Sequence, residues 1–105
     1  MTSQQNILLK IKSIVSKIDP QAQIILYGSR STGKARPDSD WDFLILTNSQ
    51  VNYKTEQKFS YPIYELEWET GNVFSVIVKS KQEWESPKYK ISPLYHNVLK
   101  DGMYL

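Results

Sequence analysis

The chain has 105 residues, of which 40% are hydrophobic and 23% charged, and its formal net charge is +2. This length and composition predict one soluble domain over residues 1–105 with a single core. The small charge argues against nucleic acid or a membrane surface as the main partner, and no apolar run approaches the roughly 20 residues that span a bilayer. The absence of cysteine excludes disulfides, thiolate nucleophiles and cysteine-based zinc sites, and it fits a cytoplasmic protein.

The N-terminal segment predicts an amphipathic helix. Apolar residues recur at helical spacing over 7–18, and most of the lysines fall outside the apolar stripe. Thr2 and Gln5 have the spacing of a capping box at the start of this helix. Asp19-Pro20 ends it, because proline disfavours helical backbone in the residue before it.

Two short apolar runs then predict buried strands, over 23–27 (QIILY) and 41–46 (WDFLIL). The segment between them is rich in Gly, Ser, Arg and Asp, and it predicts a loop with one short helical turn around 31–35. Because side chains alternate along a strand, Asp42 shares one face of the second strand with Asp40 and with the leucines that follow.

A second long helix is predicted from about residue 55 to residue 70, where Gly71 stops it. Pro62 interrupts this helix. Either the helix kinks at the proline, or its regular part starts near Ser60 as a cap.

The last third of the chain predicts a third strand over 73–78 (VFSVIV) and two further helices. The first of these is short and starts at Ser80, which has capping-box spacing to Glu83. The second starts at Ser92-Pro93, a cap followed by proline at the first helical position, and ends at 101–102. The predicted order α, β, turn, β, α, β, α, α indicates an α/β (α+β) fold, in which helices pack on a small mixed sheet.

Most of the chemistry lies in the segment 27–46, YGSRSTGKARPDSDWDFLIL. Gly28-Ser29, here called the Gly-Ser pair, directly follows a buried strand, where glycine lets backbone N–H groups approach a ligand closely. A serine hydroxyl beside the free N–H groups of a helix start makes a site for an anion. Arg30, Lys34 and Arg36 add three positive charges within seven residues.

Asp40 and Asp42, here called the acid pair, stand two residues apart at the start of a strand. Their side chains point to the same face, with Cα atoms about 6–7 Å apart. Two converging carboxylates suit one hard cation such as magnesium, which takes oxygen ligands. A phosphate cradle beside an acid pair is the combination that phosphoryl or nucleotidyl transfer needs.

The motif Gly28-Ser29 with Gly33, followed by Ser39-Asp40-x-Asp42, resembles the signature of the nucleotidyltransferase superfamily related to DNA polymerase beta. The small size resembles the minimal nucleotidyltransferase (MNT) branch, many of whose members are antitoxin partners of HEPN-domain proteins. The resemblance implies a nucleotidyltransferase-like fold with an NTP site, expected to prefer ATP, and with Mg²⁺ or Mn²⁺ as cofactor.

The same resemblance implies a role for each matching residue. The Gly-Ser pair is expected to contact the nucleotide phosphates, and the acid pair to bind the metal as the catalytic carboxylates. Ser39 is expected to orient the acid pair. Arg30 either contacts phosphate or supports the loop.

One departure from the family pattern concerns a third carboxylate, which active members of the superfamily place on the following strand. Here that strand, 73–78, holds no acid, and Ser75 or a neighbour occupies the expected place. The nearest acids are Glu65, Glu67 and Glu69 on the preceding helix and Glu83 beyond the strand, and Glu69 is the best candidate among them. Without a third acid the acceptor has no evident general base, whose help is typically worth about 10²–10⁴-fold.

Two functions from different classes therefore remain open. The first is a metal-dependent nucleotidyltransferase that binds an NTP and transfers NMP to a hydroxyl of a HEPN-type partner protein. The alternative is a catalytically degenerate antitoxin or regulatory subunit that binds a nucleotide or only a partner. A nucleic-acid-binding adaptor is a weaker third option, which the modest charge disfavours.

Three other residues have plainer interpretations. Asp38 is expected to satisfy backbone donors of its own loop. His96, the single histidine, is expected on the surface or in packing. Trp41 points away from the acid pair and is expected in the core.

Overall fold

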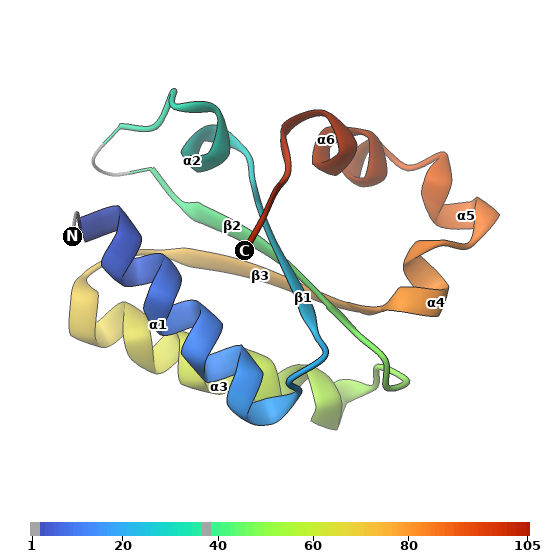
Figure 1. The fold of residues 1–105 in the computed structure, drawn as a ribbon, viewed down its shortest axis with the longest axis horizontal. Helices are drawn as coiled ribbons and strands as arrows, with labels where there is room; N and C mark the ends of the chain where they lie inside the picture. The colour runs from blue at the N-terminus through green and yellow to red at the C-terminus, as the bar shows by residue number, and fades with distance from the viewer. Residues whose placement is uncertain (1–2, 37–38) are drawn as a thin grey trace.

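The computed structural model describes residues 3–36 and 39–105 (Figure 1). Across these residues no helix is both long and apolar enough to cross a membrane. The elements in chain order are α1 (Ser3–Ile18), β1 (Gln23–Tyr27), α2 (Ser29–Thr32), β2 (Trp41–Thr47), α3 (Tyr53–Thr70), β3 (Phe74–Ser80), α4 (Lys81–Trp84), α5 (Pro87–Lys90), α6 (Pro93–Asp101) and β4 (Met103–Tyr104).

The strands form one four-stranded mixed sheet in the order β3-β2-β1-β4. β1 is antiparallel to both β2 and β4, whereas β2 and β3 are parallel. The register places Tyr27 opposite Asp42 on one side and Ser75 opposite Asp42 on the other. Helices pack on this sheet, so the predicted α/β (α+β) fold with a small mixed sheet is confirmed.

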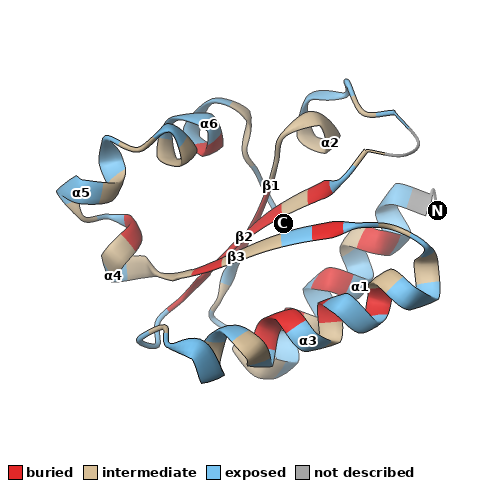
Figure 2. Cartoon of the chain, turned by 180° about the vertical axis from the view of Figure 1, so that it is seen from behind, coloured by how far each residue is buried: buried red, intermediate tan, exposed pale blue. Residues whose placement is uncertain are grey.

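The two faces of the sheet have separate cores. α1 and α3 lie side by side against one face, where Phe43 and Ile45 of β2 point (Figure 1). The other face carries Leu44 and Leu46, and it is covered by residues of α4 and α6 such as Trp84. Figure 2 shows buried residues along β2 and on the inward sides of α1 and α3. Asp42 alternates with the leucines, so its side chain lies on the face opposite α1 and α3.

α3 is longer and more regular than the sequence pattern predicts. It begins after Asn52, whose side chain accepts a hydrogen bond from the backbone N–H of Thr55 at 2.9 Å. Pro62 lies inside the helix. Ser60 is buried in the helix and its hydroxyl donates to the backbone oxygen of Glu56 at 2.9 Å, so it is not a cap.

The two predicted caps near the C-terminus are confirmed. The Ser80 hydroxyl accepts from the backbone N–H of Glu83 at 3.0 Å, and the Ser92 hydroxyl accepts from that of Tyr95 at 3.1 Å. The pattern did not predict the short helix α5 or the two-residue strand β4. A Cβ at Gly102 would overlap the backbone oxygen of Val98, so glycine lets the chain turn tightly from α6 into β4. The proposed capping role of Thr2 lies outside the described residues.

A buried hydroxyl ties the end of α1 to the end of β2. Thr47 is 1% exposed, and its hydroxyl donates to Asp19 Oδ2 at 2.6 Å. This hydrogen bond holds the pKa of Asp19 below its ordinary value, and the backbone N–H of Gln21 adds to the effect. A carboxyl whose folded-state pKa is lowered stabilises the fold above its unfolded pKa, and this stabilisation is lost as pH falls through the folded pKa.

Replacing Thr47 with valine is therefore expected to lower the free energy of unfolding by about 1–2 kcal/mol at pH 7. The difference in the free energy of unfolding between this variant and the wild type should shrink as pH falls through the lowered pKa of Asp19. The reason is that the hydrogen bond from Thr47 is weaker to a protonated carboxyl than to a carboxylate. Urea unfolding at pH 7 and pH 3 measures both effects. Ser16→Ala, which removes an exposed hydroxyl, is the control and should change stability by less than about 0.5 kcal/mol. An equal loss for Thr47→Val at both pH values would contradict the role of Asp19.

Candidate functional site

The ends of β1 and β2 bring the Gly-Ser pair against the acid pair. Gly28 follows Tyr27, the residue paired with Asp42, and it adopts a φ of 77° that favours glycine. A Cβ on Gly28 would lie 2.6 Å from Asp42 Oδ2. The Asp42 carboxylate therefore rests on a backbone surface that only glycine leaves open.

The two carboxylates of the acid pair differ in their exposure to solvent. Asp42 is half-buried, whereas Asp40 is exposed in the loop just before β2. Burial raises the pKa of Asp42, and the charge of Asp40 raises it further. The same surroundings raise the pKa of Tyr27, first through burial and then through the charge of Asp42. A carboxylate whose ionised form is disfavoured by burial and by a neighbouring negative charge gains from a cation placed beside it.

The donor set of the acid pair fits a divalent cation only in part. Among the described residues there is no group of three or more carboxylate, histidine or cysteine side chains that could hold a metal. Two carboxylates can nevertheless hold a magnesium ion that also binds phosphate oxygens and water, because this ion keeps several waters and needs few protein ligands.

A single helical turn begins within the Gly-Ser pair. α2 starts at Ser29, and both the backbone N–H and the hydroxyl of Ser31 donate to the backbone oxygen of Gly28, at 3.1 and 2.8 Å. The turn closes at Gly33, whose φ is 77°. These bonds fix the backbone on which the half-buried Ser29 sits.

The loop between α2 and β2 is supported by Arg30. Its guanidinium donates to the backbone oxygen of Ser39 from Nη2 at 3.0 Å and from Nε at 3.3 Å. The same group lies over the ring of Trp41 at 4.5 Å from the centroid. The Ser39 hydroxyl accepts from the backbone N–H of Arg36 at 2.8 Å. Both side chains thus shape the backbone that leads into Asp40, and for Arg30 the contacts match the loop-supporting role.

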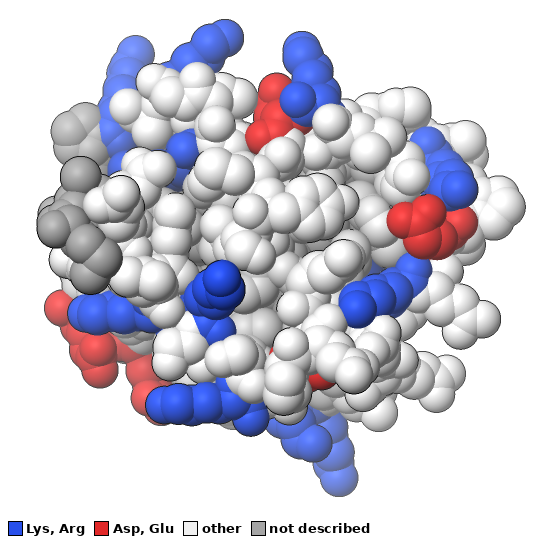
Figure 3. All heavy atoms as spheres, in the orientation of Figure 1, with Lys and Arg blue, Asp and Glu red and all other residues white. Residues whose placement is uncertain are grey.

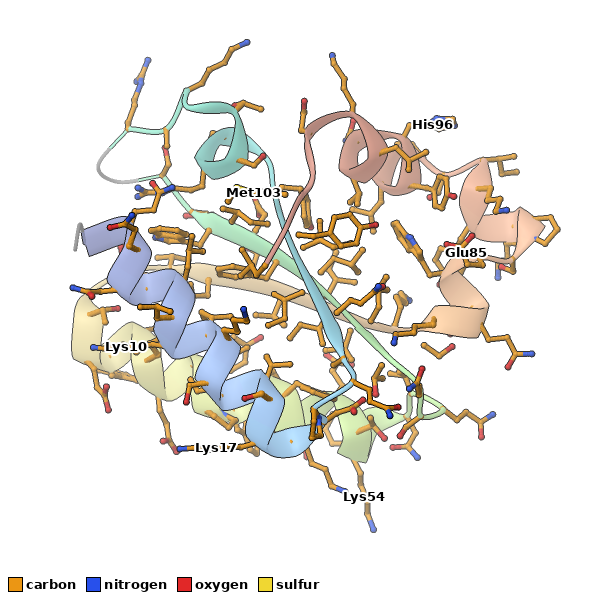
Figure 4. The ribbon with its side chains drawn as sticks, viewed as in Figure 1. Lys10, Lys17, Lys54, Glu85, His96 and Met103 are labelled. Carbon is orange, nitrogen blue, oxygen red and sulfur yellow. The ribbon has the colours of Figure 1, made fainter. Side chains whose placement is uncertain are left out.

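The plainer interpretations agree with the structure where it describes them. Trp41 is 2% exposed and stacks on Phe43 with centroids 6.2 Å apart, so it belongs to the core on the α1–α3 face. His96 is exposed on α6 and contacts only the edge of Tyr95 among the ring contacts of the described residues (Figure 4). The interpretation of Asp38 falls outside the described residues.

On the neighbouring strand β3, the residue beside Asp42 is a serine. Ser75 of β3 pairs with Asp42 in the parallel register, so its side chain lies on the same face. Ser75 is exposed. The position beside the acid pair on the neighbouring strand therefore holds a short hydroxyl in place of an acid.

The expectation that a glutamate of α3 completes the acid pair is wrong. α3 packs on the sheet face opposite Asp42, so its side chains cannot reach the acid pair. Glu67 accepts a hydrogen bond from the backbone N–H of Phe74 at 2.8 Å, and Glu69 lines a hollow between α1 and α3. Glu83 lies beyond the far end of β3, where it pairs with Lys79 at 3.8 Å.

The lysines near the C-terminus do not form a purely basic surface. Lys79 donates to the hydroxyl of Tyr89 at 2.8 Å and also faces Glu83, and Lys90 lies 3.6 Å from Glu85. Mixed charge of this kind gives little attraction for a phosphate backbone, which argues against the nucleic-acid adaptor.

Comparison with known proteins agrees with this fold and motif. Residues 8–100 match the family described as the nucleotidyltransferase domain, and the chain therefore belongs to that family. No curated protein sequence matches it significantly.

Three crystal structures of toxin-antitoxin systems contain a chain with the same fold. One is a toxin-antitoxin with AMP-PNP, with a TM-score of 0.65 and 18% identity, covering 91% of this chain and 69% of that one. Another is a MntA-HpeT mutant with two aspartates changed to glutamate, with a TM-score of 0.61 and 16% identity over 91% of this chain and 69% of that one. The third is a MntA-HpeT mutant with a tyrosine changed to alanine, with a TM-score of 0.62 and 17% identity, covering 100% of this chain and 72% of that one. At these identities the likeness concerns the fold.

Proposed function

We propose that this chain is one nucleotidyltransferase domain that binds an NTP, with ATP as the expected nucleotide, together with Mg²⁺ or Mn²⁺. The observation that carries the proposal is the contact of the Asp42 carboxylate with Gly28, which sets the acid pair beside the Gly-Ser pair. Family membership supports it, as does the presence of AMP-PNP in one structure of similar fold.

In this proposal each part of the site has a separate task. The acid pair holds the cation, which when bound neutralises charge on the triphosphate. Ser29 and the backbone around Gly28 donate to phosphate oxygens, in a turn that the bonds from Ser31 keep rigid. Arg30 and Ser39 hold the loop that leads into Asp40, and the proposal requires Asp40 to face the same side as Asp42.

The proposed reaction transfers NMP to a hydroxyl of a partner protein in the cytoplasm. The hydroxyl oxygen forms a bond to the α-phosphorus while the bond from that phosphorus to the β-phosphate oxygen breaks. Pyrophosphate leaves, and the hydroxyl proton passes to a base. The toxin-antitoxin structures of similar fold support a protein partner, for which a HEPN-type toxin is our proposal.

A binding-only function is the second candidate, and one observation favours it. Ser75 lies on the next strand beside Asp42, where it supplies no carboxylate that could act as base. A chain that binds the nucleotide there but cannot activate an acceptor would serve as an antitoxin or regulatory subunit. Activity of the complete complex then requires a base from the partner.

One experiment separates the two functions. The chain is incubated with labelled NTPs and magnesium, alone and with its co-purified partner. The mass of each protein is then measured by mass spectrometry. A mass increase of one or more NMP units on the partner supports transfer, whereas tight NTP binding without any mass change supports the binding module. Absence of NTP binding under all conditions would overturn both nucleotide-binding functions and leave only a subunit that binds its partner protein.

Ser29→Ala tests the phosphate contact. We expect ATP binding to weaken by roughly 0.5–1.5 kcal/mol, because one hydroxyl donor is lost. Binding of adenosine, measured by the same calorimetry, should not change. Equal affinity of the wild type for ATP and adenosine would show that the Gly-Ser pair does not bind phosphate.

A further inference from the structure

The outward side of α3 carries a row of exposed aromatic residues. Tyr53, Tyr61, Tyr64 and Trp68 are spaced by eight, three and four residues, so they follow one helix face with Gln57 between them. Trp68 is 92% exposed and Tyr53 73%. The amide of Gln57 donates to the hydroxyl of Tyr61 at 2.9 Å. We call these five residues the aromatic stripe.

A second row, the charged stripe, runs beside the aromatic stripe on α3. It consists of Lys54 and Lys58 in the first half of the helix and Glu65 and Glu69 in the second half. Each half places like charges four residues apart, which mildly destabilises a helix on its own. Within the described part of the chain none of the four has an ion-pair partner. Figure 3 shows acidic side chains gathered at the lower left, where α3 ends, and Figure 4 shows Lys54 projecting at the opposite end.

The order of charges makes this helix complementary to itself. If two copies of α3 cross antiparallel about a two-fold axis near Tyr61 and Pro62, Lys54 of each copy lies opposite Glu69 of the other. Lys58 then lies opposite Glu65. In antiparallel helix pairs the same flank of both helices meets, so a single charged stripe pairs with its own copy. We propose that the chain forms a homodimer through the aromatic and charged stripes of α3, packed antiparallel.

A hollow on the surface of α3 can accommodate Trp68, the largest side chain of the aromatic stripe, from the other copy. In the same arrangement Trp68 of one copy lies opposite the segment around residue 55 of the other. A hollow of about 430 Å³ lies there, lined by Lys54, Gln57, Lys58, Tyr61 and Pro62. An indole ring in this hollow meets lysine side chains on its faces, which adds cation–π attraction.

The area of the stripe is sufficient for a modest interface. Given that a large aromatic side chain covers about 150–250 Å², the four exposed rings offer on the order of 500 Å² per copy. Two copies therefore bury about 1,000 Å², the lower limit for a specific interface. α3 and the acid pair lie on opposite faces of the sheet, so dimer formation leaves the nucleotide site of both copies open.

Sedimentation equilibrium of the whole chain over a wide concentration range tests the dimer. The wild type is expected to shift from monomer to dimer as its concentration rises. Trp68→Ala should raise the dissociation constant roughly 30-fold or more, as expected for a large aromatic side chain that is buried in a hollow of the partner copy. Lys58→Glu and Glu65→Lys, each of which places two like-charged contacts in the dimer, should each raise it about tenfold.

Charge exchange provides the sharper test. Mixing the Lys58→Glu chain with the Glu65→Lys chain should restore association, because every facing pair is then of opposite sign, and the double variant should dimerise with itself. Ile91→Ala, in the turn after α5, and Lys100→Glu, on α6, change exposed residues away from α3, so these matched controls should leave the equilibrium unchanged. A wild type that stays monomeric at millimolar concentration would overturn the proposal. So would a dimer that is insensitive to Trp68→Ala, or failure of the mixed chains to associate.

Discussion

Replacing Asp42 with asparagine is expected to abolish magnesium-dependent NTP binding while the fold stays intact. The change keeps the shape of a side chain that rests on Gly28 but removes one of the two carboxylates available to the cation. Loss of an outer partner of a metal site typically costs 10–100-fold in affinity, so loss of a direct ligand should weaken binding of magnesium–ATP by about 100-fold or more. Calorimetric titration with magnesium–ATP measures this.

Stability of the same variant separates a binding defect from a folding defect. Burial and the charge of Asp40 both disfavour the ionised form of Asp42, which is why its pKa is raised. Removing that charge should therefore leave the free energy of unfolding unchanged or slightly higher. Asp101→Asn, at the end of α6, is the matched control and should keep full ATP affinity. Unchanged magnesium–ATP affinity in Asp42→Asn would mean that the acid pair is not the cation site.

Features set by neighbouring residues could be predicted from the sequence. The strand β1 has the predicted bounds, since an apolar run between turn signals specifies it. The caps Ser80 and Ser92 were predicted because a hydroxyl and the backbone N–H it serves lie three residues apart. The same alternation along β2 correctly put Trp41 in the core, and Asp40 lies close enough for its charge to act on Asp42.

Features that depend on distant pairing could not be predicted in this way. β4 is two residues long and has no pattern of its own, and it exists because β1 offers a free edge for pairing. Glu69 was the best candidate for a third acid because chain distance alone does not tell which face of the sheet a helix covers. Glu69 is excluded because α3 packs on the sheet face opposite Asp42. The parallel register of β2 and β3 instead shows that Ser75 is the residue beside Asp42.

We expect slow or absent transfer by the isolated chain because Ser75 supplies no base, and replacing it with aspartate should reverse this. Because Ser75 is exposed and pairs with Asp42, a carboxylate there would lie beside the acid pair without displacing core residues. It could accept the proton of an acceptor hydroxyl. We expect NMP transfer to rise by about 10²–10⁴-fold, the usual contribution of a general base. Mass measurement of the partner after incubation with ATP and magnesium gives the rate.

Ser75→Asn is the matched control, since it has the size of aspartate but accepts no proton at neutral pH. Aspartate is also a poor strand former, at a cost of up to about 1 kcal/mol, so both variants are first compared with the wild type in unfolding and in ATP affinity. If Ser75→Asp binds ATP as the wild type does yet transfers no faster, the position beside Asp42 is not where the base acts. Fast transfer by the isolated wild type would also mean that the base does not act from the position of Ser75. A rise in Ser75→Asp alone would instead mean that this chain is a nucleotidyltransferase that lacks only its base.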